Sequence, residues 1–379
     1  MNLKEYVTHL RRKIHQYPEL GFREYETQKL IIEELEKLNI PYKKSSTKTG
    51  VIAEIGTGAR KEKIIAFRAD IDALPIQEET DKPYSSKIDG KMHACGHDSH
   101  TAILLGFARE IVKYKDKIQG KARLIFQPNE EGNGACHIIE QGALEPKPEM
   151  IFGLHVTPFL PTGSIGLKYD ELMAGVDNFK ILLTGVGGHA AMPHHTPDII
   201  LAGACLVQAL NTIIPRNIVA SDSAVVTVTK ISSGANFNII PKELEILGTI
   251  RTFAQKTKDK ISKRIHEISE NYAKAYKLDS QITIETISKP LYNNKKLVDL
   301  VKNTCQKNIV MLEKPSMGGE DFSEYLEHVP GCFIFLGIRN EDKGIIHSWH
   351  NPKFDVDEDA MPVGVNLFVD LAKKYFELK

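Results

Sequence analysis

Potential metal ligands are densest in one short segment of the sequence. Four histidine and cysteine side chains fall within the eight residues His93–His100, directly before the start of a predicted helix over 101–115. If this segment is extended, residues two positions apart point to the same side, so Cys95 and His97 could face one ion while Gly96 lets the backbone approach. Imidazole and thiolate groups suit zinc and the neighbouring transition metals. A helix N-terminus with a capping side chain and incidental histidines would produce the same segment, so both interpretations stay open.

Two adjacent acidic residues, Glu130 and Glu131, follow a predicted buried strand over 122–126. Adjacent side chains on extended backbone diverge, so Glu131 could bind a metal while Glu130 accepts a proton from the attacking water as a general base. For an isolated Glu-Glu pair, a solvated acidic turn is the commoner interpretation.

Histidines supply two further candidate sites. His155 is predicted at the carboxyl end of a buried strand over 150–154, where the ligand sites of α/β sheets gather. His347 and His350 stand near the carboxyl terminus. A single histidine is more often structural, but four candidate sites that each lie at a loop beside a strand or helix together indicate a metal centre.

The elements that must position these residues follow two patterns. The first comprises helices over 25–38 and 101–115 and strands over 50–55, 63–67, 122–126 and 150–154. The second comprises strands over 178–184, 224–231 and 244–252 and helices over 197–214 and 258–276. The first pattern is typical of a sheet covered by helices, and the second of two helices on one face of a small, largely antiparallel sheet. Because the first pattern returns after about residue 291, we predict an α/β domain over 1–174 and 288–379 and an inserted α+β domain over 175–287.

Composition agrees with an ordinary globular enzyme. The chain has 379 residues, enough for two domains, with 42% hydrophobic and 26% charged residues. Its 49 basic and 49 acidic residues balance, so nucleic acid is not an expected partner. Neither a secretory signal nor a membrane span is expected, because no segment forms the long apolar run that either requires. The five scattered cysteines suit reduced thiols, and we therefore expect a cytoplasmic protein.

Several motifs stand in the order in which they occur in a known family. They are Pro18–Gly21, Arg68–Pro75, Cys95–Asp98, Gln127–Gly132, Gly187–Ala190 and Gly318–Phe322. On these motifs the sequence resembles, over nearly its whole length, the metallopeptidase-related amidohydrolases. That family includes hippurate hydrolases, N-acyl-amino-acid deacetylases such as N-acetyldiaminopimelate deacetylase, and plant auxin-conjugate hydrolases. The resemblance implies a di-metal exopeptidase-like catalytic domain with a mixed sheet covered by helices, an inserted lid and dimerisation domain, and a homodimer or homotetramer.

The resemblance also implies two divalent metal ions and a set of ligands for them. The ligands would be Cys95, which bridges both ions, with His97, Glu131, His155 and His350. Zinc or manganese is the first expectation, and nickel or cobalt would also suit this mixed donor set. We choose His350 over His347 because the family's histidine usually stands two residues before a proline, here Pro352.

Other residues match catalytic and substrate-binding positions of the family. Glu130 would be the general base, and Asp70 would support the metal site from behind by orienting a ligand. His189 would reach the active site of a partner subunit and polarise the scissile carbonyl. The positions that match substrate-binding residues are Asn238, Arg251 and Gly319. The planar guanidinium of arginine suits a substrate carboxylate.

The expected reaction is hydrolysis of an N-acyl-L-amino acid to a carboxylic acid and a free amino acid by a metal-activated water. Three alternatives stay open: a thiol hydrolase with Cys95 as nucleophile, an aminopeptidase or dipeptidase, and a metal-binding or ligand-sensing module without catalysis. Cysteine at the bridging position, where other branches use aspartate, favours the acyl-amino-acid branch. The size of the acyl group depends on pocket shape, which no motif reports.

Overall fold

The computed structural model describes residues 1–46, 48–60, 63–305 and 308–378. The chain divides into two compact units. The first unit comprises Met1–Leu172, Tyr292–Pro315 and Asp321–Lys379, and the second comprises Met173–Leu291 and Ser316–Glu320. The short segment Ser316–Glu320 therefore packs with the second unit, although it is separated from it along the chain. The catalytic, lid and dimerisation roles expected for the two domains remain predictions.

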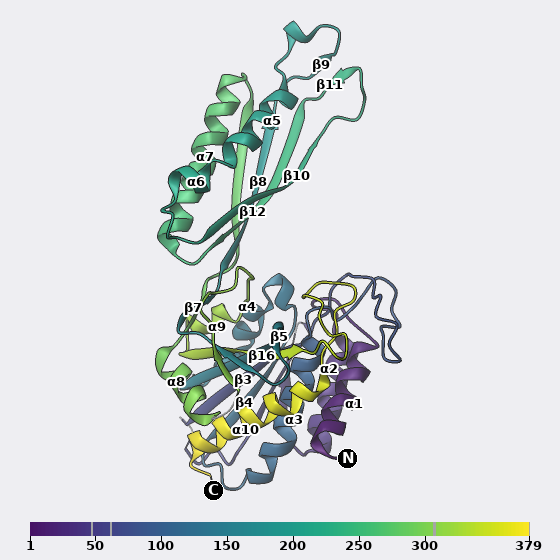
Figure 1. Ribbon diagram of the computed structural model, residues 1–379, viewed down its shortest axis with the longest axis vertical. Helices are drawn as coiled ribbons and strands as arrows, with labels where there is room; N and C mark the ends of the chain where they lie inside the picture. Colours follow the sequence, from purple (N-terminus) through teal and green to yellow (C-terminus); the bar gives the residue numbers. More distant parts are fainter. Residues whose placement is uncertain (47, 61–62, 306–307, 379) are drawn as a thin grey trace. The chain divides into compact units, whose positions relative to one another are not determined.

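A mixed sheet forms the centre of the first unit (Figure 1). Within the described residues its strands stand in the order β1 (Tyr42–Lys44), β2 (Val51–Ile55), β4 (Lys121–Gln127), β3 (Ile64–Asp70), β5 (Met150–Pro161), β16 (Gly331–Arg339), β6 (Ile165–Leu167) and β15 (Ile309–Met311). The central strands β4, β3, β5 and β16 run parallel. Parallel strands end at the same edge of a sheet, so the residues after β3 and β4 emerge side by side. All residues of β3 are buried, as expected for a parallel sheet covered on both faces.

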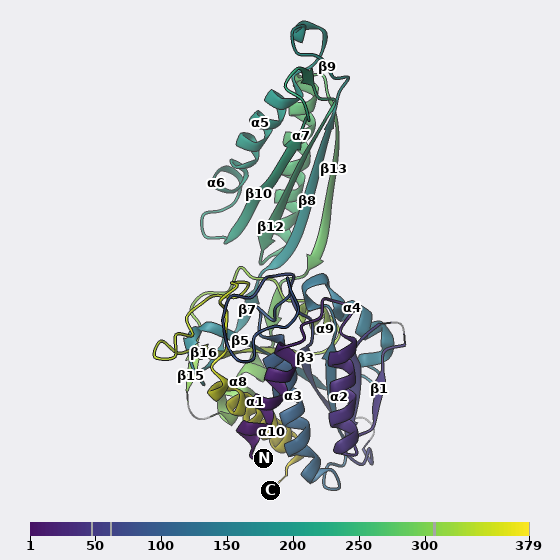
Figure 2. The same cartoon turned by 90° about the vertical axis from the view of Figure 1, so that its right-hand side faces the viewer.

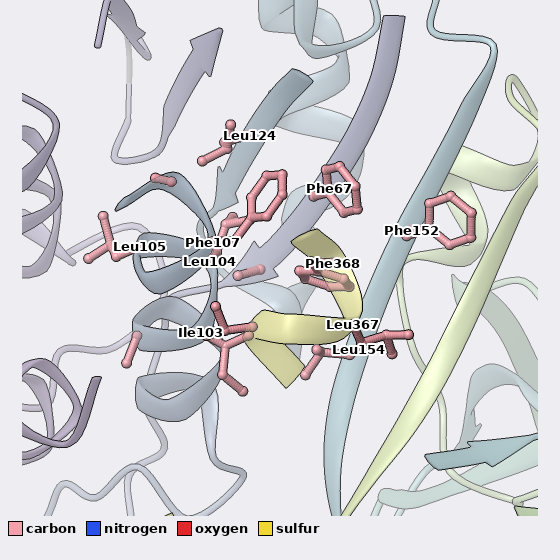
Figure 3. Close-up of a cluster of buried hydrophobic side chains, with 14 of the residues drawn as sticks. Phe67, Ile103, Leu104, Leu105, Phe107, Leu124, Phe152, Leu154, Leu367 and Phe368 are labelled. Carbon is pink, nitrogen blue, oxygen red and sulfur yellow. The ribbon is translucent and has the colours of Figure 1, made fainter. Parts of the chain in front are cut away.

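Helices cover this sheet. They are α1 (Leu3–His15), α2 (Tyr25–Lys37), α3 (His97–Ile111), α4 (Gly134–Ile138), α8 (Lys295–Thr304), α9 (Ser323–Leu326) and α10 (Met361–Phe376), with shorter helical turns η1 (Val112–Tyr114), η2 (Glu130–Gly132), η3 (Ile139–Ala143) and η5 (Glu358–Ala360). The helices α3 and α10 pack against each other and against β3. The ring centroid of Phe67 on β3 lies 4.4 Å from that of Phe107 on α3 and 4.9 Å from that of Phe368 on α10 (Figure 3). Burial of each such ring stabilises the fold by roughly 2–3 kcal/mol, so this core holds α3 rigidly on the sheet.

An antiparallel sheet forms the centre of the second unit, with helices on one face (Figure 2). In the described chain its strands stand in the order β10 (Ala224–Ser233), β12 (Glu243–Thr252), β8 (Gly175–Thr184) and β13 (Asp279–Ser288), and the helices are α5 (Ile199–Leu210), α6 (Ile213–Asn217), α7 (Gln255–Ala275) and the turn η4 (Pro193–His195). Buried residues alternate along β12, because one face meets the helices and the other does not. Two further strand pairs are β9 (Gly188–His189) with β11 (Ile239–Ile240), and β7 (Asp170–Met173) with β14 (Leu291–Asn293).

The predicted fold class is confirmed, since a mixed sheet with helices is accompanied by a separate antiparallel region. Some predicted elements were wrong in their limits. The helix expected over 197–214 is two helices, because the side chains of Asn211 and Thr212 bond to the carbonyl groups of Val207 and Ala209 and compete with continued helix. The strand β13 was not predicted, because charged and polar residues dilute its alternation of isoleucines.

Two expectations from composition can be compared with the structure. None of the described helices combines the length and the apolar character that crossing a bilayer requires. All five cysteines lie in the described part of the chain, and no disulfide joins any two of them.

Candidate metal centre

A cluster of potential metal ligands lies beside the carboxyl ends of β3 and β4. Cys95, His97 and His155 offer ligand atoms that lie within 4.8 Å of one another, and so do Cys95, Glu131 and His350. The two groups share one atom, the Cys95 sulfur. The five ligand candidates from the sequence are therefore brought together as two overlapping sets of three, all within the first unit.

The backbone between Cys95 and His97 is a turn, so the extended geometry expected from the sequence was wrong. Gly96 has φ 93° and precedes the first residue of α3, which is His97. A Cβ at Gly96 would lie 2.4 Å from Cγ2 of Val156. Glycine is needed both for the left-handed conformation and for this close approach. The helix begins four residues earlier than predicted, which places His97 on the rigid end of α3.

The two buried histidines each use one ring nitrogen for the protein and direct the other into the cluster. His97 Nδ1 lies 3.0 Å from the carbonyl oxygen of Asp72, while its buried Nε2 has no hydrogen-bond partner. His155 Nδ1 lies 2.7 Å from the carbonyl oxygen of Val156, and its Nε2 lies 3.3 Å from Cys95 Sγ. Since a carbonyl oxygen only accepts, both Nδ1 atoms carry a proton, which is the tautomer that orients a metal-binding histidine.

His155 lies within β5 and not at its end, because β5 continues to Pro161. The pairing of β3 with β5 stops at Gly153. His155 therefore lies two residues beyond the last residue of β5 that pairs with β3, level in register with Asp70 at the carboxyl end of β3. The edge position expected from the sequence holds relative to that neighbour alone.

The two acidic residues lie in the helical turn η2 and not on extended backbone, so the expected geometry was wrong here as well. Their side chains nevertheless diverge. Glu131 Oε1 lies 3.2 Å from His350 Nε2, whereas Glu130 Oε2 lies 3.9 Å from His97 Nε2. Glu130 Oε1 also accepts a 3.5 Å hydrogen bond from the Asp321 backbone N–H. The Glu131 carboxylate thus belongs to the group with Cys95 and His350, and the Glu130 carboxylate lies beside His97.

The pKa values of three side chains in the cluster are shifted upward by their surroundings. Burial raises the pKa of the Cys95 thiol, and hydrogen bonds to Cys95 and Glu131 raise the pKa of His350 to about 10. Burial lowers the pKa of His97, but Asp70 and Cys95 outweigh burial and raise it well above its ordinary value. A divalent ion bound to these groups would displace their protons, so metal binding should strengthen as the pH rises. The orphaned His97 nitrogen and the mixed thiolate, imidazole and carboxylate set fit a transition-metal site.

Asp72, which the sequence argument did not single out, contacts three parts of the cluster. Its Oδ1 and Oδ2 accept hydrogen bonds from the backbone N–H groups of Glu130 at 2.9 Å and Glu131 at 3.2 Å. Its Oδ1 also lies 3.3 Å from His97 Nδ1. The carboxylate therefore fixes the acidic turn and the imidazole together. Its two-residue spacing from Asp70 at the end of a buried strand was the signal in the sequence that could have identified it.

Asp70 lies behind the cluster, and its expected role in orienting a ligand stays a prediction. It accepts hydrogen bonds of 2.6 Å from Arg68 Nη1 and from His100 Nδ1. His100 Nε2 in turn accepts the backbone N–H of Val156 at 2.9 Å. The nearest oxygen of Asp70 is 3.9 Å from His97 Nε2. Asp70 thus ties β3, α3 and β5 together behind the cluster.

The carboxyl-terminal histidine of the cluster is held by its backbone. His350 adopts φ 61°, and its N–H donates to the carbonyl of Ala94 at 2.9 Å, next to Cys95. His347 belongs to none of the ligand groups formed by the described residues. The geometry therefore favours His350 as a ligand, in line with the choice made from the proline spacing.

The four candidate residues of the second unit form two separate pairs. His189 of β9 and Asn238, directly before β11, are exposed and lie on neighbouring strands. Arg251 pairs with Val176 at the start of β8, and a Cβ at Gly319 would lie 2.3 Å from Cγ2 of the same valine. The β9 and β11 strands lie beyond the opposite end of β8 (Figure 1). These four residues are therefore not brought into one site within the second unit.

Comparisons with known proteins place the chain among characterised sequences. The family model for peptidase family M20/M25/M40 matches residues 66–374. The chain is 40% identical over 378 residues to the N-acetyl-L-cysteine deacetylase of Bacillus subtilis, covering 99% of this chain and 89% of the relative. It is 40% identical over 386 residues to the IAA-amino acid hydrolase ILR1-like 4 of Arabidopsis thaliana, covering 99% and 87%. A solved structure of a Bacillus subtilis dinuclear metal-binding peptidase from the M20 family matches with a TM-score of 0.84 and 35% identity, covering 100% of this chain and 99% of that one.

We expect Asp72→Ala to weaken zinc binding about 10- to 100-fold, because the acidic turn and His97 would lose their common anchor. The measurement is the zinc content retained after dialysis against a series of buffered free-zinc concentrations. Asp89→Ala, at an exposed position, is the matched control and should leave the binding curve unchanged. Equal zinc affinities for the two variants would contradict the anchoring role of Asp72.

Proposed function

Because the chain belongs to peptidase family M20/M25/M40, a family of metal-dependent hydrolases of amide bonds, we propose that it hydrolyses N-acyl-L-amino acids to a carboxylic acid and a free amino acid. The family resemblance drawn from the motifs is confirmed. The observation that carries the proposal is the pair of ligand groups sharing Cys95, with the Glu130 carboxylate beside them. The names of the two relatives, a deacetylase of N-acetyl-L-cysteine and an IAA-amino acid hydrolase, support this substrate class.

The proposed ligands divide between two divalent cations. Cys95, His97 and His155 would hold one ion, and Cys95, Glu131 and His350 the other. The similar M20 structure is a dinuclear metal-binding peptidase, which supports a pair of ions. Bound cations would lower the pKa of a water held between them and polarise the scissile carbonyl. Zinc or manganese suits these donors best, with nickel or cobalt as alternatives, so the metal available to the protein decides among them.

Glu130 is the proposed general base. Its carboxylate lies beside His97 and belongs to neither of the two groups that share Cys95, although it also falls in a group with His97 and Glu131. We assign the proton transfer to Glu130 and the binding of the ions to the two groups that share Cys95. It accepts a proton from the attacking water and later returns it to the leaving amine. The Asp321 backbone N–H, 3.5 Å from Glu130 Oε1, restrains the carboxylate while the proton is transferred.

The second unit is proposed to supply substrate contacts from two chains. Val176, the second residue of β8, and Thr184, its last residue, are eight positions apart, or roughly 26 Å at about 3.3 Å per strand residue. This span exceeds the length of an N-acyl amino acid. One substrate therefore cannot touch both the His189–Asn238 pair and the Arg251–Gly319 pair of the same unit. If all four residues act on one substrate, two copies of the chain must contribute, which supports a homodimer or a tetramer built from dimers.

Roles for these four residues follow from their side chains. His189 would donate to the carbonyl oxygen as negative charge develops there, a contribution of about 3 kcal/mol for a preorganised donor. Arg251, Asn238 and the backbone at Gly319 would bind the substrate carboxylate. Burial lowers the pKa of Arg251, and an anionic substrate would favour its charged form.

A thiol hydrolase is the rival that the geometry also suggests, since Cys95 Sγ lies 3.3 Å from His155 Nε2. A nucleophilic cysteine needs a low thiol pKa. Here burial raises the pKa of Cys95, and burial lowers that of His155 well below its ordinary value. Neither residue is thus activated for direct attack, and the metal-dependent reaction is preferred. Two further alternatives are an aminopeptidase or dipeptidase and a metal-binding module without catalysis. A panel of substrates would distinguish both from an acyl-amino-acid hydrolase.

The proposed substrate class predicts hydrolysis in a panel of N-acetyl, N-benzoyl and indole-acetyl amino acids. Protein reconstituted with zinc, manganese, cobalt or nickel should release free amino acid from at least one panel member, and a chelator should abolish the release. Dipeptides with a free amino group serve as the comparison. Preferential cleavage of the dipeptides, or activity that survives metal removal, would contradict the proposal.

Glu130→Gln should lower kcat by about 10²–10⁴-fold with little change in metal content, because the amide cannot accept the proton. Steady-state kinetics on the best panel substrate, together with metal analysis of the same sample, would measure both effects. Glu140→Gln, at an exposed position in η3, is the matched control. A Glu130→Gln variant that keeps its metals and the parent kcat would show that another group is the base.

Two inactive variants should complement each other if His189 acts on the active site of a partner. Mixing His189→Ala with Glu130→Gln and allowing subunits to exchange would leave one intact site in each mixed dimer. Activity should then recover to about a quarter of the parent value, since half of randomly formed dimers are mixed. A monomer in sedimentation, or a mixture as inactive as its components, would contradict action across subunits.

A further inference from the structure

The amino-terminal motif Pro18–Gly21 has no part in the proposed reaction, yet its segment contacts the residue that follows Asp72. The carbonyl of Glu19 accepts the backbone N–H of Ala73 at 2.8 Å, and Leu20 forms a β-bridge with the same residue. Ala73 follows Asp72 directly. The segment is therefore attached to the stretch of chain that carries the anchoring carboxylate.

Glu24, three residues after this motif, contacts Asn129, the residue directly before the helical turn η2 that carries Glu130 and Glu131. Its side chain is fully buried, and its Oε1 accepts the backbone N–H of Asn129 at 2.9 Å. Its Oε2 accepts a hydrogen bond from the hydroxyl of Thr49, which is also buried. Asn129 immediately precedes Glu130, so Glu24 bonds to the first residue of the turn that carries both functional carboxylates.

Asn129 has a turn conformation that several contacts fix. Its φ of 54° lies in the left-handed region, which asparagine adopts more readily than most residues with a side chain. Its carbonyl oxygen accepts the N–H groups of Gly132 at 3.1 Å and Gly134 at 2.7 Å, which closes the turn. Its side chain packs on Gly21, where a Cβ would lie 1.8 Å from Asn129 Oδ1. The segment thus holds Asn129 by its backbone and by its side chain.

We propose that Glu24 is a positioning residue that fixes the Asn129 turn and thereby the placement of Glu130 and Glu131. The Glu130 and Glu131 N–H groups are held by Asp72, and the Asn129 N–H is held by Glu24. Removing the Glu24 carboxyl group takes away the acceptor of the partly buried Asn129 N–H and one of the contacts that hold this turn, so the turn relaxes. Displacements of about 1 Å at a catalytic group cost large factors in rate. The proposal rests on the proposed roles of Glu130 and Glu131.

The oxygen acceptor matters here more than the negative charge. Burial raises the pKa of Glu24 to about 7, against the hydrogen bond from Thr49, so the buried site does not favour a full charge. Glutamine keeps an oxygen for the Asn129 N–H, and its amide can donate to the Thr49 hydroxyl, which is able to accept. Glutamine should therefore replace glutamate at this position, whereas alanine should not.

The experiment compares Glu24→Ala, Glu24→Gln and Gly21→Ala with the parent protein by titrating metal-free protein with Mn²⁺ and by measuring kcat and KM with manganese loaded. Glu24→Ala should bind Mn²⁺ about tenfold more weakly and lose kcat by about tenfold with little change in KM. Glu24→Gln should stay within about threefold of the parent in both quantities. Gly21→Ala, which keeps Glu24 but displaces the Asn129 side chain, should reproduce the loss and replaces Glu24→Ala if that variant does not fold.

The matched control is Glu19→Gln. Glu19 Oε2 accepts the backbone N–H of Thr27 at 2.9 Å near the start of α2. Among the described residues, its side chain bonds within this region of α2 and not to Asn129. Its replacement should lower the melting temperature and leave the Mn²⁺ affinity and kcat unchanged. Losses in Glu19→Gln equal to those of Glu24→Ala would reduce Glu24 to a general structural role. Parent-like Mn²⁺ affinity and kcat in Glu24→Ala would overturn the proposal outright. A parent protein that hydrolyses no acyl-amino acid would instead overturn the proposed function, and the Mn²⁺ titrations would still test the positioning role.

Discussion

The carboxylate of Asp72 is the contact on which the geometry of the cluster depends. It accepts the N–H groups of two adjacent residues after β4 and contacts the imidazole at the start of α3. These segments can meet because β3 and β4 are parallel neighbours that end at the same edge. A carboxylate shared between two backbone donors is a strong, directional acceptor. Asp72 therefore fixes the distances between the Glu130 and Glu131 side chains after β4 and the His97 side chain at the start of α3.

A network of buried charges supports the same region from behind. Arg11 of α1 is fully buried and donates to Asp98 at 2.8 Å through Nε and to Asp355 at 2.8 Å through Nη2. His15 Nδ1 lies 2.7 Å from the same oxygen of Asp98. Against burial, Arg11 and His15 hold the pKa of Asp98 far below its ordinary value. Removing one member would leave an uncompensated buried charge. The network therefore fixes the first turn of α3 to α1 and to the segment at Asp355.

Bringing ionisable groups together in a buried cluster costs free energy. A buried thiol, two buried imidazoles and two carboxylates lie together; burial raises the pKa of Cys95, and Asp70 and Cys95 raise that of His97 against burial. A rigid scaffold is needed to keep such groups close, because each would otherwise relax toward solvent. The packing of α3 and α10 on β3 and the buried hydrogen bonds of Asp70 provide that scaffold. Cation binding would then return part of this stored free energy.

The sequence alone determined which residues could form the site and which class of fold carries it. The Cys95–His97 spacing and the Glu130–Glu131 pair left structural interpretations open by themselves, and the ordered family motifs, with the proline after His350, implied the set of ligands. The local geometry was not predictable in the same way. The turn at Gly96 depends on close approach to Val156, and the helical turn at Glu130 depends on acceptors supplied by Asp72 and Glu24.

Tertiary structure alone decided the partners of each buried polar group. The sequence argument singled out Asp70 and not Asp72, but Asp70 bonds to Arg68 and His100 while Asp72 holds the acidic turn. The choice follows from where β3 ends, since residues beyond the last strand pair are free to turn toward a neighbouring segment. Hydrogen-bond partners far apart in the chain are selected by packing of the whole unit, and no local pattern of residues encodes that selection.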